Sequence, residues 1–267
     1  MPELPEVNTL VAALRHHLRG DSIVRWQKLS LKLRKTIPDE DDADQILKKP
    51  IREILRLGKS VFFKFSARQY LHVHLGMTGY FRLAAKLEPP GKHEHLRLTL
   101  SSGRILCYCD PRKFGVIELM ERLPETGLEP FSGSLTTGAF LEICKNRKAA
   151  IKSVIMNQRL IAGLGNIYAN EALFGAGINP CKPACELSLE EAKKLVQAIV
   201  EVTVESVNSG LASLPPAFVI DEHTTHFPVS TRVYGQEGSI CKKCGSHRIV
   251  KTMVAGRSSF FCPACQN

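Results

Sequence analysis

The sequence predicts an α+β protein: an N-terminal β-sandwich flanked by an N-terminal helix, then a helical module, then a β-hairpin held by four cysteines. Three observations support this prediction. Short β-rich runs separated by Gly, Pro and Ser fill most of residues 22–121. Apolar residues recur at helical spacing between about 139 and 207. Two C-x2-C pairs lie near the C-terminus.

A helix is expected close to the N-terminus, after a short extended segment from Pro2 to Pro5. The positions with helical spacing are Val7, Leu10, Val11, Leu14 and Leu18, and Gly20 follows as a C-cap. Strands are expected at 60–65, 70–75, 96–100, 104–109 and 116–120. Helices are expected at 139–144, 149–157, 167–174 and 187–207, and a mobile loop at 210–230.

These elements divide the chain into four parts. The predicted domains are a β-sandwich domain at 1–122, a linker at 123–137 that is rich in Pro, Gly, Ser and Thr, a helical domain at 138–230, and a four-cysteine unit at 231–267. A chain of 267 residues with 44% hydrophobic and 23% charged residues is typical of globular proteins, so global disorder and fibrous repeats are excluded.

The net charge of +10 predicts a polyanionic partner. The chain has no apolar run long enough to span a bilayer, and its start, Met1-Pro2-Glu3-Leu4-Pro5-Glu6, lacks the basic flank and apolar core of a secretory signal. We therefore expect a cytoplasmic protein that does not bind a membrane. Nucleic acid is then the polyanionic partner that we expect.

Four of the nine cysteines form a pattern typical of a metal site. Two C-x2-C pairs, Cys241 with Cys244 and Cys262 with Cys265, are separated by 17 residues, as in tetrathiolate zinc sites. Four thiolates complete the tetrahedral coordination of zinc, so we expect one structural Zn²⁺ and chemistry elsewhere. The other five cysteines show no pattern and are expected to be reduced thiols: Cys107, Cys109, Cys144, Cys181 and Cys185.

The segment between the two cysteine pairs predicts a β-hairpin with Arg257 at its tip. Residues 241–267 contain five basic side chains and no acidic one. Spacing alone fits a DNA-binding hairpin and a fold-stabilising ribbon with a solvated arginine equally well. The basic count favours binding to DNA phosphates or a groove.

The first residues can supply nucleophilic chemistry. Aminopeptidases normally remove Met before a small residue, which exposes Pro2 as a secondary amine. A terminal amine titrates near pH 8, so about a tenth or more of it is uncharged at neutral pH and can attack an electrophilic sugar carbon. Glu3 and Glu6 could then donate protons and stabilise charge. On residue types alone, a proline with two glutamates favours an ordinary helix start over a nucleophilic site.

Five motifs in order resemble the bacterial formamidopyrimidine-DNA glycosylases over nearly the whole chain. They are Met1-Pro2-Glu3-Leu4-Pro5-Glu6-Val7, His74-Leu75-Gly76-Met77, Asp110-Pro111-Arg112-Lys113-Phe114-Gly115, Gly163-Leu164-Gly165-Asn166-Ile167-Tyr168 and the four-cysteine unit. The resemblance implies that the helical domain holds a helix-two-turn-helix element and a lesion-capping loop, and that 231–267 is a zinc finger. It further implies a bifunctional base-excision repair enzyme that acts on damaged double-stranded DNA.

In that family the enzyme excises oxidised purines (formamidopyrimidines and 8-oxoguanine) and cuts the abasic strand by β,δ-elimination through a Schiff base. The resemblance implies that Pro2 is the nucleophile, that Glu3 is the proton donor, that Glu6 tunes both, and that Lys59 is a catalytic loop lysine near the lesion and its phosphate. Met77, Arg112 and Phe114 match the residues that fill the void left by the flipped base. The remaining residues implied to contact DNA are Lys152 (a weaker candidate), Asn166, Tyr234 and Arg257.

The sequence departs from the family after the long helix. Residues 209–216 read Ser-Gly-Leu-Ala-Ser-Leu-Pro-Pro, without the hydroxyl pair of the family's capping loop. Because proline has no N–H, Pro215 and Pro216 cannot present the same donors, which predicts weaker dependence on this loop and a lesion preference shifted towards formamidopyrimidines or oxidised pyrimidines. Asn8 also replaces a usual acidic residue, which we expect to have little effect.

Two alternatives remain open. One is an endonuclease VIII-like enzyme that prefers oxidised pyrimidines, although Leu4 and the Asp110–Gly115 motif favour the formamidopyrimidine branch. The other is a zinc-ribbon protein that binds damaged DNA without catalysis and would not need a free Pro2. We expect a monomer associated with the bacterial nucleoid.

Overall fold

The computed structural model describes residues 2–214 and 220–267. The chain folds into two compact units. Unit 1 comprises the described residues of Met1–Glu125 and Ser209–Phe227, and unit 2 comprises Thr126–Asn208 and Pro228–Asn267. Within the described ranges, no helix is long and apolar enough to cross a membrane.

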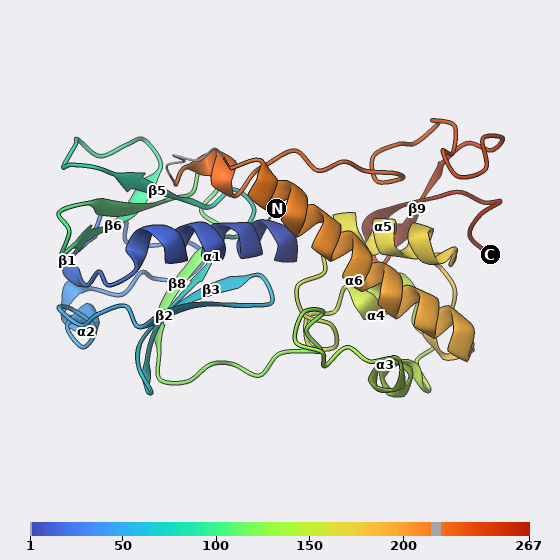
Figure 1. Ribbon diagram of the computed structural model, residues 1–267, viewed down its shortest axis with the longest axis horizontal. Coiled ribbons are helices and arrows are strands. Elements are labelled where there is room, and N and C mark those ends of the chain that lie inside the picture. Colours follow the sequence, from blue (N-terminus) through green and yellow to red (C-terminus); the bar gives the residue numbers. More distant parts are fainter. Residues whose placement is uncertain (1, 215–219) are drawn as a thin grey trace. The chain divides into compact units, whose positions relative to one another are not determined.

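Unit 1 holds two antiparallel four-stranded sheets (Figure 1). The first sheet has the order β1-β6-β7-β5, with β1 at Ile23–Lys28, β6 at Glu94–Leu100, β7 at Ile105–Cys109 and β5 at Tyr80–Ala84. The second has the order β2-β3-β4-β8, with β2 at Glu53–Leu57, β3 at Ser60–Ser66, β4 at Gln69–His74 and β8 at Val116–Met120. The remaining elements of unit 1 are α1 (Leu4–Leu18), α2 (Glu40–Ala43) and the 3-10 turn η2 (Glu222–Thr224).

The two sheets pack face to face around one apolar core, to which the buried face of α1 contributes. The aromatic rings of Phe63 on β3 and Phe81 on β5 meet edge to face with centroids 5.9 Å apart, and Phe81 meets Tyr108 on β7 in the same way at 5.6 Å. The predicted β-sandwich with a flanking helix is therefore confirmed, as are the five expected strands.

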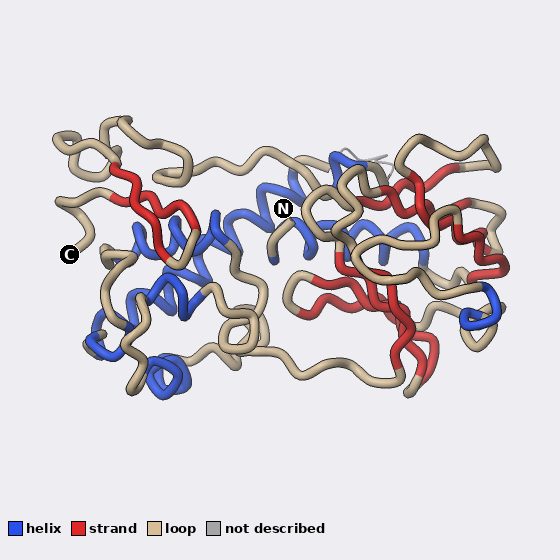
Figure 2. Tube along the Cα trace, turned by 180° about the vertical axis from the view of Figure 1, so that it is seen from behind, coloured by secondary structure: helices blue, strands red, loops and turns tan. Residues whose placement is uncertain are grey.

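Unit 2 is helical and carries a terminal hairpin. Its elements are α3 (Thr137–Cys144), α4 (Ile151–Ile155), α5 (Asn166–Ala176), the 3-10 turn η1 (Ala184–Glu186), α6 (Leu189–Ala212, whose last residues belong to unit 1), β9 (Val250–Val254) and β10 (Arg257–Phe261). The hairpin pairs Arg257 with Val254 across the turn Ala255-Gly256. It lies beside α5 (Figure 2).

Three details of the predicted elements are wrong. Helix α1 begins at Leu4, so Leu4 and Pro5 are not extended: a proline fits the first helical turn, where its missing N–H has no intrahelical acceptor. Helix α4 is shorter than expected at both ends. Helix α6 continues to Ala212, so the expected loop does not begin at Gly210.

Gly210 lets this helix end pack closely in unit 1. A Cβ at Gly210 would lie 2.5 Å from the ring of Phe227 and 2.7 Å from Thr9 Oγ1. The glycine is therefore required by close packing rather than by a turn. Pro215 and Pro216, on which the expected change in the capping loop depends, lie outside the described residues.

Candidate functional site

The N-terminal residues of unit 1 are buried at the start of α1. Pro2 is buried, and Glu3 and Glu6 are only 2% and 5% exposed. Glu3 occupies the N-cap position with extended backbone, and its N–H donates to Glu6 Oε2 at 2.8 Å. Carboxylates are favoured at this end of a helix by the unpaired backbone N–H groups. The helix start therefore fixes two carboxylates directly beside Pro2.

Lys59 occupies the two-residue turn between β2 and β3. Leu57 pairs with Ser60 across this turn, and Gly58 takes a positive φ of 56° that favours glycine. Arg56 supports the turn by donating from Nη1 to the carbonyl of Gly58 at 2.9 Å. Arg56 Nε also donates to Asn8 Oδ1 of α1 at 3.4 Å. Asn8 therefore contributes to a link between the N-terminal helix and the lysine turn.

His74 lies at the end of β4 in the electrostatic field of this turn. Burial, together with the nearby His72, Lys59 and Arg34, lowers the pKa of His74 to about 4. Its neutral Nδ1 accepts a hydrogen bond from the N–H of Gly76 at 3.0 Å. The ring therefore stays neutral at physiological pH and holds the chain just before Met77.

The residues predicted to fill the DNA void lie on two turns of unit 1. Met77 follows β4 and is 37% exposed, whereas Arg112 and Phe114 lie between β7 and β8, with Phe114 44% exposed. The Arg112 guanidinium carbon lies 4.9 Å from the centre of the Phe114 ring, in cation–π contact. Exposed apolar side chains on turns are available to insert between bases.

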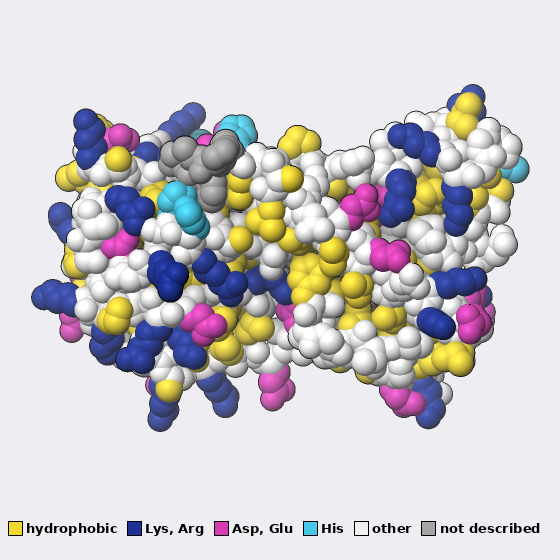
Figure 3. Space-filling model, in the orientation of Figure 1, with side chains coloured by type: hydrophobic (Ala, Val, Ile, Leu, Met, Phe, Trp, Pro, Cys, Tyr) yellow, Lys and Arg dark blue, Asp and Glu magenta, His cyan; other side chains and the backbone are white. Residues whose placement is uncertain are grey.

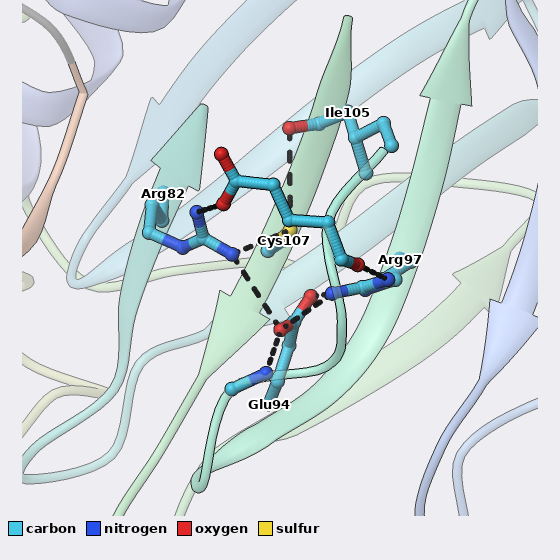
Figure 4. Close-up of polar contacts among 7 residues, drawn as sticks. Arg82, Glu94, Arg97, Ile105 and Cys107 are labelled. Atoms are coloured by element: carbon cyan, nitrogen blue, oxygen red, sulfur yellow. Dashed lines mark hydrogen bonds and ion pairs between the residues drawn. The ribbon is translucent and has the colours of Figure 1, made fainter. Parts of the chain in front are cut away.

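A buried ion-pair network lies on strands β5, β6 and β7 of the first sheet (Figure 4). Arg97 Nε donates to Glu94 Oε1 at 2.5 Å, and Arg82 approaches the same carboxylate at 3.6 Å. Burial alone raises the pKa of Glu94, but the bonds from Arg97, Cys107 and the N–H of Gly91 outweigh it and lower the pKa to about 2. The thiol of Cys107 contacts the Glu94 carboxylate, and burial raises the pKa of this thiol to about 12.

Basic side chains also cover a part of unit 1 far from Pro2. Lys and Arg gather over the end of α1 and over β2 on the face seen in Figure 3. A hollow of about 220 Å³ at this place is lined by Arg15, Arg19 and Arg52. The length of α1 separates it from Pro2 by roughly 20 Å, at 1.5 Å per residue. Positive charge alone therefore does not locate the site.

In unit 2, three of the residues predicted to contact DNA lie in the hairpin or against it. Asn166 is the first residue of α5 and donates from Nδ2 to the carbonyl of Ser258 at 3.1 Å. Lys152 on α4 is 0% exposed, and its Nζ donates to the same carbonyl at 2.7 Å and to Ser259 Oγ at 2.6 Å. Arg257, the residue before Ser258, is exposed. The buried ammonium of Lys152 thus anchors the strand that presents Arg257.

Tyr234 is held by a carboxylate that the sequence alone did not single out. Glu171 on α5 is 2% exposed, and its two oxygens accept the backbone N–H groups of residues 232, 233 and 234 at 2.9 Å each. Its neighbour Asn170 accepts the N–H of Phe260 at 2.7 Å. A polar pair within the otherwise apolar stretch of α5 was the available signal, because a buried acidic residue needs donors.

The four zinc-finger cysteines converge. Their sulfur atoms lie within 4.8 Å of one another, with Cys241 and Cys265 at 3.9 Å and Cys244 and Cys262 at 3.8 Å. A tetrahedral zinc ion with Zn–S bonds of about 2.3 Å places its sulfur ligands roughly 3.8 Å apart, whereas a disulfide requires about 2.05 Å. The residues therefore fit a tetrathiolate zinc ion.

Three family models match the chain. They are the formamidopyrimidine-DNA glycosylase N-terminal domain at residues 1–117, the formamidopyrimidine-DNA glycosylase H2TH domain at 126–215, and a zinc finger found in FPG and IleRS at 238–267. The curated formamidopyrimidine-DNA glycosylase of Geobacter metallireducens is 37% identical and that of Thiobacillus denitrificans 38% identical, each over the full length of both chains.

Solved structures agree with this similarity. The Lactococcus lactis Fpg in complex with abasic-site DNA has a TM-score of 0.88 and 32% identity, covering 99% of both chains. The wild-type Lactococcus protein in complex with DNA that contains an oxidised pyrimidine has a TM-score of 0.86 and 32% identity over the full length of both.

Proposed function

Because the chain belongs to the formamidopyrimidine-DNA glycosylase family, we propose that it excises oxidised purines from duplex DNA and cuts the abasic strand through a Schiff base on Pro2. The enzyme is a DNA glycosylase of base-excision repair and a lyase of abasic sites. It holds one structural zinc ion in its terminal finger. The identity of the lesion and the roles of individual residues are what we propose.

The burial of Glu3 and Glu6 beside Pro2 carries the proposal. Once Met1 is removed, the uncharged Pro2 nitrogen attacks C1′ of the damaged nucleotide, and the glycosidic bond breaks with the electron pair leaving on the base, which gains the proton that the Pro2 nitrogen loses. Glu3 donates a proton to the sugar ring oxygen, so the ring opens and Pro2 is left in an iminium with C1′. Glu6 holds the backbone of Glu3 and so positions both groups.

Strand cutting follows from the iminium. The iminium makes a C2′ proton acidic; its loss expels the 3′ phosphate, and a second elimination expels the 5′ phosphate. Lys59 carries a positive charge on a short turn, which suits binding of the phosphate beside the lesion. Arg56 and Asn8 position that turn.

The DNA is held by residues of both units. Met77, Arg112 and Phe114 fill the void of the flipped base, and the Arg112 guanidinium hydrogen-bonds the orphaned partner base. Asn166, Tyr234 and Arg257 contact phosphates, as suits an amide at a helix start, a hydroxyl and an exposed arginine. Lys152 acts on DNA indirectly, since its ammonium is buried against Ser258 and Ser259.

The range of lesions is broader than 8-oxoguanine in this proposal. The described part of the 209–216 segment is a helix end followed by residues 213 and 214, without the family's hydroxyl pair. A relative of the same fold, from Lactococcus lactis, has been solved in complex with DNA that contains an oxidised pyrimidine. We therefore infer that formamidopyrimidines are preferred and that oxidised pyrimidines are also accepted. The enzyme acts as a monomer on nucleoid DNA.

Borohydride trapping tests the nucleophile. Wild-type enzyme, verified by mass spectrometry to lack Met1, should form a covalent adduct with duplexes that carry a formamidopyrimidine or an abasic site. Pro2→Gly should trap and cleave far more slowly. Equal trapping by Pro2→Gly would show that Pro2 is not the nucleophile, and no adduct with the wild type would favour a non-catalytic damage-binding protein. An assay over a panel of lesions separates the formamidopyrimidine from the endonuclease VIII-like preference.

A further inference from the structure

Two turns of unit 1 that are more than thirty residues apart in the chain are joined by one buried carboxylate. Asp110, the residue that follows β7, is 0% exposed. Its Oδ1 accepts the hydroxyl of Thr78 at 2.6 Å, and its Oδ2 accepts the N–H of Gly115 at 2.8 Å. Thr78 directly follows Met77, and Gly115 directly follows Phe114. The two oxygens of Asp110 thus reach both turns at once.

Arg112 is tied to the same group. Its backbone N–H lies 3.2 Å from both Asp110 Oδ1 and Thr78 Oγ1. Hydrogen bonds to a carboxylate are stronger than those between neutral groups and are costly to leave unmade when buried. Asp110 therefore bonds Arg112 directly, and it bonds the residues that follow Met77 and Phe114.

Glycines allow the two turns to touch backbone to backbone. Gly76 has a φ of 66°, and a Cβ there would lie 2.5 Å from the carbonyl carbon of Phe114. A Cβ at Gly115 would lie 1.8 Å from the hydroxyl of Tyr108. There is thus no room for a side chain at either glycine, and the two turns lie in close backbone contact at Gly76.

Asp110 is itself fixed from behind. Its N–H donates to the carbonyl of His93 at 2.9 Å, and its carbonyl lies 2.9 Å from His95 Nε2. His95 Nδ1 is in turn 2.8 Å from the hydroxyl of Ser30, which donates to it when Nε2 carries the proton. The carboxylate therefore has one position from which to hold both turns.

We propose that Asp110 and Thr78 are positioning residues that lock Met77, Arg112 and Phe114 into a single preformed wedge, which enters the DNA stack as one body. This rests on the proposed function, which assigns those three side chains to the void. A wedge that is ordered before binding avoids the entropic cost of immobilising each side chain in the complex. The contributions of Met77 and Phe114 to base flipping are then coupled through the Thr78–Asp110 bond.

A stopped-flow experiment on wedge insertion tests this without any chemistry at Pro2. The probe is a duplex with a tetrahydrofuran abasic analogue and 2-aminopurine next to it, whose fluorescence rises when the stack opens. Thr78→Val removes the bridging hydroxyl at nearly constant shape, and Thr78→Ser keeps it. Asp110→Asn tests the acceptor, and thermal unfolding of each variant checks that unit 1 is folded.

We expect Thr78→Val to slow insertion about tenfold, and Thr78→Ser to insert at nearly the wild-type rate. In a Met77→Ala background, Thr78→Val should cost clearly less than tenfold, because one of the three side chains that it helps to position is gone. A tenfold loss in both backgrounds, or no loss in either, would overturn the proposal. Because the probe is not cleaved, these outcomes are independent of whether Pro2→Gly abolishes trapping, which decides the proposed function.

Discussion

The backbone N–H of Glu3 donates to the side chain of Glu6 at 2.8 Å, three residues along the same helix start. This bond satisfies one of the first N–H groups around α1 and fixes the residue next to the amine of Pro2. A local capping interaction and the proposed chemistry thus share the same two carboxylates. The helix start that the residue types suggest and the nucleophilic site that the family implies are compatible.

Replacing Glu6 should separate these two roles. Glu6→Ala removes the acceptor, and we expect a loss of about 1–2 kcal/mol of unfolding free energy and at least tenfold slower borohydride trapping. Glu6→Gln keeps an acceptor oxygen, so we expect a smaller loss of unfolding free energy and a smaller loss of trapping rate. Glu40→Ala, which removes an exposed acidic residue from the first turn of α2, is the control. Identical behaviour of the Ala and Gln variants would contradict a positioning role.

Loosening the lysine turn should affect strand cutting. Arg56→Met leaves the carbonyl of Gly58 and Asn8 Oδ1 without this donor. We expect cleavage of a preformed abasic site to slow several-fold while duplex affinity changes little. Single-turnover cleavage and fluorescence anisotropy measure the two quantities. Arg68→Met, which removes an exposed arginine paired with Glu121, should change neither.

Lys152 and Arg257 should differ in their salt dependence. Arg257→Ala removes a proposed phosphate contact, so the slope of log affinity against log salt should fall by about one. Lys152→Met should reduce stability by about 2–3 kcal/mol, because two oxygens of the hairpin lose a charged donor, yet leave the slope unchanged. A reduced slope for Lys152→Met, measured by salt titrations of duplex binding, would show a direct phosphate contact.

Removing zinc should weaken DNA binding without altering the amine. Cys262→Ser or chelation should disorder the hairpin, lower duplex affinity at least tenfold, and leave trapping recoverable at high DNA concentration. Metal content is verified by mass spectrometry. Cys181→Ser, at an exposed cysteine outside the cluster, should behave as wild type. Unchanged trapping at low DNA concentration after zinc loss would rule out a binding role for the finger.

Acid should destabilise the protein through His74. Its pKa is about 4 in the folded chain and near 6.5 when unfolded, so the unfolded state binds more protons between these values. The contribution of His74 is therefore complete above pH 6.5 and is lost as the pH falls towards 4, by up to about 3 kcal/mol. His74→Asn keeps an acceptor for Gly76 but does not titrate. Urea unfolding should show a flatter pH profile for this variant, and parallel profiles would contradict the prediction.

The sequence predicted some strands of the sandwich and missed others, and the position of each strand in its sheet explains the difference. The runs that predicted strands correspond to β3, β4, β6, β7 and β8, which include all four inner strands. The missed strands β1, β2 and β5 are each at the edge of a sheet. An edge strand faces solvent on more sides and carries charged residues such as Arg25 and Arg82, so its apolar alternation is weak.

The predictions of site residues divide in a similar way, between exposed or terminal groups and the buried groups that hold them. Motifs identified the exposed or terminal groups, such as Pro2, Met77 and Arg257, because those residue types carry chemistry. The groups that hold them were not identified as such, because their function depends on distant partners: Asp110 bonds Thr78 across 32 positions, and Glu171 bonds residues 232–234. Lys152 is the clearest case, since a basic residue in a basic protein gives no sign that its ammonium is buried.

The burial of three thiols has a consequence for the reactivity of this DNA glycosylase towards oxidants. A thiol reacts with peroxide as its thiolate, and burial raises the pKa of Cys107 to about 12 and that of Cys144 to about 11. Burial raises the pKa of Cys109 as well. At neutral pH these three cysteines hold almost no thiolate, so the core thiols react slowly with peroxide. The cysteines that are exposed instead are Cys181 and Cys185 and, in the zinc finger, Cys244.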